Sequence, residues 1–404
     1  MRSEWKIRKI SDIAEVNPRE SIRKGSIAKK IPMDVLQPFT RDVPSYQMEE
    51  YKGGTKFRNM DTIMARITPC LENGKIAQVR CLNNKEVGFG STEYIVFRAK
   101  GGTDPDYLYY LIRSPLVRDP AIKSMVGSSG RQRVQTNVVS NLQIAVPDYK
   151  EQVKIGELLR ELDDKIEINN QINKNLEQQG LALYKSSFIN YAPYGGIQPD
   201  GWNIVSLEDV CIKITDGSHY SPKDEPGAPY PMYSVKDMET YGFNSSSCKH
   251  ISATEFERMK KSDCVPSVND ILVAKDGSYL KEIFICSEQK DEAVLSSIAI
   301  FRPNPNVILP DVLLFLLKQP SVRADVADNY VSGSALPRIV LKDFKKYQFT
   351  LPSINEQRKI GDILHSFRMQ IAANVKENHR LTSLRDSLLP KLMSGEIDVS
   401  DIDF

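Results

Sequence analysis

The chain repeats itself. Residues 147–160 read PDYKEQVKIGELLR and residues 352–365 read PSINEQRKIGDILH, which places matching residues at a constant offset of 205. Matches continue at or near this offset in both directions, and Trp5 and Trp202 open two further similar stretches. Internal similarity fixes the architecture before any single motif is considered. The 404-residue chain therefore consists of two copies of one unit, about 200 residues each.

The two copies differ unevenly along their length. Their ends match closely, whereas the middle parts, residues 17–96 and 214–300, barely match. The copies therefore share a structural framework built from the matching segments, here called the frame. They differ in the segments that this frame presents to a partner.

A long apolar stripe marks the best-matching part of each copy. Residues 149–188 contain no proline, and their apolar residues recur at spacings of three and four. The second copy repeats this pattern up to Leu392, although Pro390 interrupts it near its end. About 40 residues of helix span roughly 60 Å. Such a helix cannot bury its stripe alone. We expect the two helices to pair about a local twofold axis, which makes them antiparallel.

Asparagines break this stripe near the centre of each helix. Asn169 and Asn374 are related by the repeat offset, and antiparallel pairing is expected to bring them together. A buried amide pair can fix the register of a coiled coil at some cost in stability. In the alternative interpretation, the asparagines face solvent or another chain.

The remaining segments predict small globular domains. Segments rich in β-branched residues and flanked by Gly, Pro, Asn or Asp predict strands: residues 94–99, 141–147, 270–275 and 297–303. Residues 104–118 and 309–323 predict one helix in each copy, which begins after the first proline and ends near the next.

The fold class that follows is α/β in the mixed, α+β sense. Two small domains are separated by two long antiparallel helices that form a coiled coil, with a pseudo-twofold internal repeat. The expected boundaries are 1–147 for the first domain, 148–190 for its helix, 191–352 for the second domain, 353–395 for its helix and 396–404 for an acidic tail.

Composition excludes several classes of protein. With 41% hydrophobic residues, the chain is too apolar for wholesale disorder. Its longest aliphatic and aromatic run, residues 312–317, is far shorter than the roughly 18 residues that a membrane helix needs. The N-terminus offers no continuous apolar stretch of the kind that a secretion signal requires. We therefore expect a cytoplasmic protein with no membrane partner.

The motifs of catalysis and metal binding are absent from the sequence. Six cysteines are spread singly, without a CxxC pair, which argues for reduced thiols and against a zinc site. There is no GxxxxGK[ST] loop, no GxGxxG turn and no NPPY or DPPY run. PDYKE at 147–151 is similar to a nuclease pattern, but its second copy, PSINE, lacks the aspartate and the lysine. We predict no catalytic residue and no metal site.

Charge is divided unequally between the copies. Residues 1–147 hold 24 Lys and Arg against 15 Asp and Glu, whereas residues 191–352 hold 17 against 21. The basic excess of the first domain suits a polyanion, although a solvated basic face is the commoner explanation.

Small residues and basic side chains gather in loops beside the predicted strands. GSSGRQR at 127–133 and GSALPR at 333–338 precede the strand that leads into each long helix. Glycine permits close approach, and arginine can bind a phosphate or two acceptors of a guanine; the alternative is a flexible turn. The candidate DNA contacts are Arg66, Lys75, Ser128, Ser129, Arg131, Arg133, Ser218, His219, Lys223, Lys275, Ser278, Ser334 and Arg338.

Two variable domains alternate here with two similar helices, each introduced by a Gly-Ser loop, an arginine, a strand ending in proline, and EQxKIGxxL. This arrangement resembles the specificity subunit of type I restriction-modification systems over nearly the whole chain. TDGSHYSP at 215–222 also resembles a common opening of the family's recognition domains, whereas Leu336-Pro337 departs from the family's smaller loop residues.

The resemblance implies a division of labour. The two domains would be target recognition domains that each read one half of a bipartite, asymmetric sequence in double-stranded DNA. The helices would be spacers that dock two modification subunits, and two restriction subunits would complete the complex. The resemblance implies no cofactor in this chain: S-adenosylmethionine, and ATP with Mg for cleavage, would be used by the other subunits.

Two other functions stay open at this stage. A coiled-coil adaptor without a DNA role would use the divergent domains to bind proteins. A stand-alone nuclease would have to cleave DNA with a metal ion and without other subunits.

Overall fold

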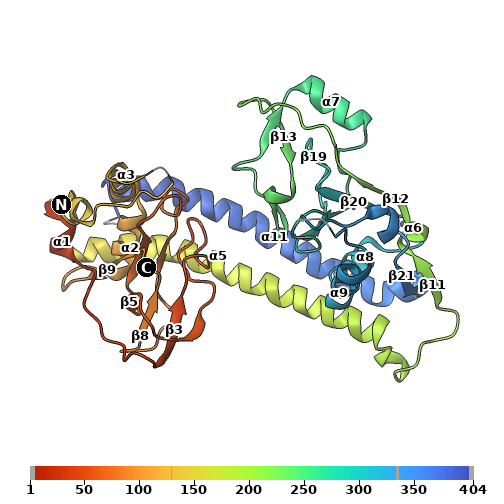
Figure 1. Ribbon diagram of the computed structural model, residues 1–404, viewed down its shortest axis with the longest axis horizontal. Coiled ribbons are helices and arrows are strands. Elements are labelled where there is room, and N and C mark those ends of the chain that lie inside the picture. Colours follow the sequence, from red (N-terminus) through yellow and green to blue (C-terminus); the bar gives the residue numbers. More distant parts are fainter. Residues whose placement is uncertain (1–4, 129, 334–335, 400–404) are drawn as a thin grey trace. The chain divides into compact units, whose positions relative to one another are not determined.

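The structure is a computed structural model that describes residues 5–128, 130–333 and 336–399. It divides into two compact units, Met1–Ile168 with Glu377–Phe404, and Asn169–Lys376. Both long helices cross this division: α5 (Tyr149–Tyr184) and α11 (Ile354–Met393) each contribute one part to either unit (Figure 1).

The first unit contains two four-stranded sheets and a two-stranded one. The first sheet is antiparallel and runs in the order β2 (Ala14–Val16), β9 (Tyr94–Ala99), β6 (Thr62–Ala65), β7 (Ile76–Gln78). The second runs β4 (Gln47–Glu50), β3 (Ile27–Ile31), β8 (Val87–Gly90), β5 (Thr55–Arg58), with β3 parallel to β8. β1 (Lys6–Lys9) pairs with β10 (Gln143–Val146) directly before α5.

The second unit repeats this plan. Its first sheet runs β12 (Cys211–Asp216), β20 (Ile298–Pro303), β17 (Ile271–Ala274), β18 (Ile283–Ile285), and β11 (Asn203–Ser206) pairs with β21 (Gln348–Leu351) before α11. The second sheet runs β16 (Lys249–Ile251), β13 (Tyr230–Tyr233), β19 (Ala293–Val294), with β13 parallel to β19. The four predicted strands are thereby confirmed as β9, β10, β17 and β20.

The middle parts share this core and differ around it. The second unit adds α7 (Ala253–Lys261) and the hairpin of β14 (Met238–Glu239) with β15 (Gly242–Phe243). In the first unit, β5 extends the second sheet beyond β8 instead. Within each unit, a short helix joins two strands, α1 (Ile10–Ile13) in the first and α6 (Leu207–Val210) in the second. Another short helix, α4 (Thr136–Ser140) or α10 (Leu341–Phe344), precedes the strand that leads into the long helix.

One predicted helix in each copy is a pair of helices. α2 (Pro105–Arg113) ends before Pro115, as expected, but α3 (Pro115–Lys123) follows at once. Ser114 between them is extended, with ψ 157°, because a residue before proline is disfavoured in the helical region. The second unit repeats the break between α8 (Pro310–Leu317) and α9 (Pro320–Asn329).

The long helices run antiparallel within the first unit. Asp163 of α5 forms a buried ion pair with Arg385 of α11, whereas Lys165 Nζ lies 3.5 Å from Glu377 Oε2, so that α11 residue numbers fall as α5 numbers rise. α11 continues through Pro390 to Met393, and the interruption predicted there is wrong. The proline lies within the last turn, and because it has no N–H, one backbone hydrogen bond of the helix is missing there.

Each unit encloses part of both helices in its own core. In the first unit, Ile155 and Leu159 of α5 are buried together with Leu392 of α11 and with Val399, which lies in the segment predicted to be a tail. In the second unit, Tyr184 at the end of α5 joins the core that also contains Leu364 of α11. A π-helical turn, Lys185–Ile189, ends α5.

An asparagine pair links the helices in the second unit, one turn away from the predicted register. Asn374 Nδ2 donates to Asn173 Oδ1 at 2.8 Å, and Gln370 Nε2 donates to Asn374 Oδ1 at 2.8 Å. Asn169, the predicted partner of Asn374, is buried one turn earlier on α5. The prediction assumed that equivalent asparagines face each other, whereas packing of the apolar side chains sets the register.

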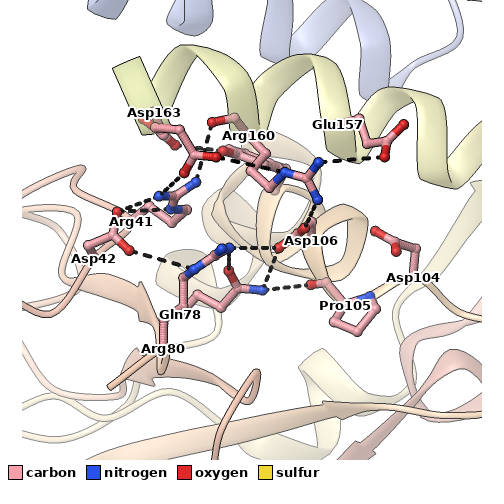
Figure 2. Close-up of polar contacts among 12 residues, drawn as sticks. Arg41, Asp42, Gln78, Arg80, Asp104, Pro105, Asp106, Glu157, Arg160 and Asp163 are labelled. Carbon is pink, nitrogen blue, oxygen red and sulfur yellow. Dashed lines mark hydrogen bonds and ion pairs between the residues drawn. The ribbon is translucent and has the colours of Figure 1, made fainter. Parts of the chain in front are cut away.

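A network of arginines and aspartates attaches the first domain to α5 (Figure 2). Arg41 is almost fully buried, and its Nη2 lies 2.6 Å from Asp164 Oδ1. Asp106, in the first turn of α2, accepts from Arg160 of α5 at 3.2 Å and from Arg80 at 3.3 Å. These ion pairs join elements that are distant in sequence and connect the domain to its helix.

Candidate nucleic-acid interface

Both units place a basic residue at one equivalent position of the frame. Arg66 follows β6: its backbone N–H donates to Glu93 O at 2.9 Å and its carbonyl accepts from Val134 N at 2.8 Å. Lys275 follows β17: its N–H donates to Ser297 O at 3.0 Å and its carbonyl accepts from Ile339 N at 3.0 Å. Two backbone hydrogen bonds thus hold each of these cations between the same two segments.

The loop before the last strand joins this position in both units. In the first, Ile67 and Arg133 form an isolated β-bridge, and Thr68 N donates to Gln132 O at 3.0 Å. In the second, Asp276 bridges Arg338, and Gly277 N donates to Pro337 O at 2.8 Å. The loops GSSGRQR and GSALPR therefore bring an arginine beside the cation of the frame.

In the first unit, a carboxylate lies between the two cations. Glu93 accepts from Arg133 Nη2 at 2.7 Å and from Arg133 Nε at 3.0 Å, and its Oε2 lies 3.7 Å from Arg66 Nε. The hydrogen bonds from Arg133 hold the pKa of Glu93 below its usual value. The carboxylate therefore stays ionised at neutral pH, and the three side chains form one partly exposed cluster.

In the second unit, the carboxylate comes from another strand. Lys275 Nζ lies 2.5 Å from Asp216 Oδ2 at the end of β12, and His219 Nε2 lies 3.3 Å from the same oxygen. Lys275 is buried, whereas the imidazole of His219 is 77% exposed. Ser218 closes the turn between them, since its Oγ donates to Tyr220 O at 2.7 Å. His219 is therefore the member of this cluster that a large ligand can contact.

Arg338 completes the second cluster. It is exposed, and among the described residues its guanidinium has no hydrogen-bonding or ionic partner. Ser278 is exposed nearby, beside an open cavity of about 460 Å³ that Lys236, Lys281 and Leu336 also line. Arg338 and Ser278 are therefore accessible to a ligand on one face of this domain.

The other candidates lie in different settings. Lys75 donates to Met33 O at 2.9 Å, which supports a structural role. Ser128 and Arg131 are exposed in the first loop, where Arg131 N donates to Ser128 O at 3.0 Å, and Lys223 is exposed in the loop after Ser218. Ser129 and Ser334 lie outside the described residues.

Sequence reasoning missed the carboxylates of both clusters. Glu93 and Asp216 are remote in sequence from the cations that they contact, and Ser297 stands in the second copy where the first has Glu93. The register of β9 and β20 provides the only signal, since Phe97 and Phe301 match at an offset of 204, as Glu93 and Ser297 do. A search for basic motifs alone could not detect this.

The part of the chain that the structure describes contains neither a metal-binding group nor a membrane-spanning helix. In 5–128, 130–333 and 336–399, no three His, Cys, Asp or Glu side chains gather as a group that could hold a metal ion. In the same part of the chain, no helix has the length and apolar character needed to cross a membrane.

Known proteins resemble this chain along most of its length. A family model described as the type I restriction modification DNA specificity domain matches residues 2–178 and 199–383. The MjaIX specificity subunit of Methanocaldococcus jannaschii is 26% identical over 75% of this chain and 71% of its own. The HindI specificity subunit of Haemophilus influenzae is 24% identical over 88% and 89%, respectively.

A solved structure supports the fold. The S subunit of a type I restriction-modification system from M. genitalium superposes with a TM-score of 0.55 at 15% identity, covering 96% of both chains. The family model matches each of the two repeats, and together the matches leave only short segments outside. The chain therefore belongs to the type I restriction-modification DNA specificity family and is a DNA-recognising specificity subunit.

Proposed function

We propose that the two domains each read one half of a bipartite, asymmetric DNA target, and that the chain itself performs no catalysis. The observation that supports this proposal is the pair of clusters described above. Arg66 and Lys275 occupy the same backbone position, each beside an arginine of the following loop, while the carboxylates around them differ. One frame that presents different donors and acceptors is what two unlike half-sites require.

The charge of the domains supports a shared task with other subunits. Residues 191–352 carry more acidic than basic side chains, yet DNA binding needs phosphate neutralisation. We infer that partner subunits supply part of this positive charge at the second half-site. Base reading itself needs only a few placed donors, such as Arg338 and His219.

The long helices are proposed to serve as spacer and docking surface. α5 and α11 would hold the two recognition domains a fixed distance apart and bind two modification subunits. Two restriction subunits would join the complex. Adenine methylation with S-adenosylmethionine, and cleavage driven by ATP with Mg, would belong to those partners.

Mapping methylated adenines tests the proposal. The chain is expressed in cells with its modification partner, either as wild type or with the exposed Arg338→Ala or with Arg66→Ala. The wild-type complex is expected to methylate one bipartite sequence, and each variant is expected to alter the half-site of its own domain only. A coiled-coil adaptor would give no chain-dependent methylation, and purified complex would then show no salt-dependent duplex binding.

A further inference from the structure

The contact between Arg133 and Glu93 uses one edge of the guanidinium. Nε lies 3.0 Å from both carboxylate oxygens of Glu93, and Nη2 lies 2.7 Å from Oε1. An arginine side chain has five N–H donors in a fixed planar fork. Both protons of Nη1 and the second proton of Nη2 are therefore left over, and among the described residues Nη1 has no hydrogen-bond partner.

Both members of the pair are held in position by the backbone. Arg133 exchanges two hydrogen bonds with Val126, at 2.9 and 3.1 Å, and bridges Ile67. Glu93 is held as well: its backbone N–H donates to Ser91 Oγ at 3.1 Å, and its carbonyl accepts from Arg66 N. The guanidinium is thus ordered before a ligand arrives, which reduces the entropy lost on binding.

We propose that Arg133, oriented by Glu93, reads a guanine in the half-site of the first domain. This inference rests on the proposed function. The free Nη1–Nη2 edge presents two parallel donors, and guanine offers two adjacent acceptors, O6 and N7, in the major groove. Adenine has a donor, N6, where guanine has O6, so that two donors would meet.

The carboxylate also argues against a phosphate as the ligand of Arg133. Phosphate binding draws its energy from net positive charge and the release of counterions. With Glu93 in contact, the Arg133–Glu93 pair carries no net charge, and with Arg66 3.7 Å from Glu93 the cluster keeps a single positive charge. A phosphate approaching Nη1 would also be repelled by the carboxylate. The acceptors of a base edge are uncharged, so this cost is smaller for guanine.

The second copy provides a natural contrast. Ser297 stands at the position of Glu93, and its Oγ accepts from Val235 N at 3.0 Å. Arg338, the equivalent of Arg133, keeps its full charge and is exposed. The orienting carboxylate therefore belongs to the first reader alone.

The test uses the complex of the full chain with its modification subunits. Competition binding compares the wild-type target with duplexes changed at each base pair, for wild type, Arg133→Lys and Glu93→Gln, and methylation mapping follows the same variants. Lysine keeps the charge but lacks the two-donor edge. In Arg133→Lys, the preference for guanine over the other bases at one base pair of one half-site is expected to fall about 5- to 150-fold.

Glu93→Gln is expected to act differently on affinity and preference. Removal of the negative charge uncovers Arg133, so that binding to all duplexes becomes tighter at low salt and more dependent on salt, while the guanine preference falls. Glu208→Gln is the control: its carboxylate forms a partly exposed ion pair with Lys345 at 3.6 Å and lies outside both clusters. This variant is expected to retain affinity and preference.

The outcomes separate this inference from the proposed function. Unchanged recognition of the other half-site shows that each variant is folded and assembled. If Arg133→Lys and Glu93→Gln leave every base preference intact, or weaken binding equally for all sequences with a salt slope lowered by about one, Arg133 does not read a base. If wild type itself recognises no bipartite target, the proposed function fails first.

Discussion

Alanine at position 156 would add one methyl group where α5 meets the start of α2. A Cβ at Gly156 would lie 2.7 Å from Asp104 Oδ1 and 2.9 Å from the backbone nitrogen of Tyr107. The same carboxylate oxygen caps α2 by accepting from Tyr107 N at 2.8 Å. Asp104 is fixed in turn by Gln152, whose Oε1 accepts from Asp104 N at 3.1 Å. The methyl group must therefore displace a helix start that is held from two sides.

The cost can be estimated from three contributions. Alanine in place of glycine favours a helix interior by about 0.5–1 kcal/mol. Loss of a side-chain cap costs about 1 kcal/mol, and an additional methyl group in a packed site typically costs about 1–3 kcal/mol. The cost exceeds the gain, so Gly156→Ala is expected to destabilise the attachment of α2 by about 1–3 kcal/mol.

The second copy supplies a matched control. Gly361 is equivalent to Gly156 by the repeat offset, but an added Cβ would collide only with Cδ1 of Leu309, and the next atoms lie 3.8 and 3.9 Å away. A terminal methyl group can rotate aside, and Leu309 makes no side-chain cap bond to α8. Gly361→Ala is therefore expected to change stability by less than about 1 kcal/mol.

Hydrogen exchange on the full-length chain measures both effects locally. Protection of the α2 amides is expected to fall about 5- to 150-fold in Gly156→Ala, while Gly361→Ala leaves the α8 amides nearly unchanged. Equal losses in the two variants, or slower exchange of α2 in Gly156→Ala, would refute the argument from close contact.

Three further perturbations test other parts of the molecule. Asp163→Asn leaves Arg385 buried without its main partner and is expected to lower the unfolding free energy by about 3–5 kcal/mol; in denaturant melts, a loss below about 1 kcal/mol would contradict this. Four residues inserted after Ile166 of α5 and after Arg380 of α11, near the ion pairs Asp163–Arg385 and Lys165–Glu377, lengthen both helices by about 6 Å. Methylation mapping is expected to show unchanged half-sites and an unread gap longer by about one or two base pairs; altered half-sites would exclude a spacer role. Because the pKa of Glu93 is lowered, its pairing is complete above the unfolded-state pKa and is lost only as pH falls through the folded value. Base preference measured between about pH 6 and pH 8 should therefore be constant, and a change in this range would show that Glu93 titrates there.

Local patterns in the sequence were sufficient to predict the helices and strands of the frame. The apolar spacing over 149–188 predicted a helix that the structure has at Tyr149–Tyr184, and the β-branched run at 94–99 predicted β9 at Tyr94–Ala99. Both signals arise from side chains that are neighbours along one element, so that the pattern is visible without knowledge of the fold.

Contacts between distant segments were not predicted. Asn173 rather than Asn169 meets Asn374, because a shift of one turn along a helix keeps the same face and leaves the periodic pattern unchanged. Glu93 was overlooked because it reaches Arg133 across 40 residues and has no acidic counterpart in the second copy. The sequence therefore identified which loops carry the basic residues. Whether each arginine is paired with a carboxylate depends on tertiary contacts.

The two copies share an ion pair with a buried aspartate and differ in an exposed one. Asp61 accepts from Arg98 Nε and Nη2 at 2.8 and 2.7 Å, and Asp270 accepts from Arg302 Nε and Nη2 at 2.8 Å each. Both aspartates are almost fully buried, beside the central strands of their first sheets. Removal of either arginine would leave a buried aspartate without its charged partner, at a cost of about 3–5 kcal/mol.

The cluster around Glu93 obeys a different energetic rule. Its ion pairs are partly exposed, and exposed pairs contribute little to stability. A change from glutamate to serine at this position of the frame, as between the two copies, therefore alters what the domain presents to DNA at small cost to its folding. In the proposed function, a chain duplicated in this way can acquire two different half-sites while both domains keep the same buried aspartate paired with an arginine.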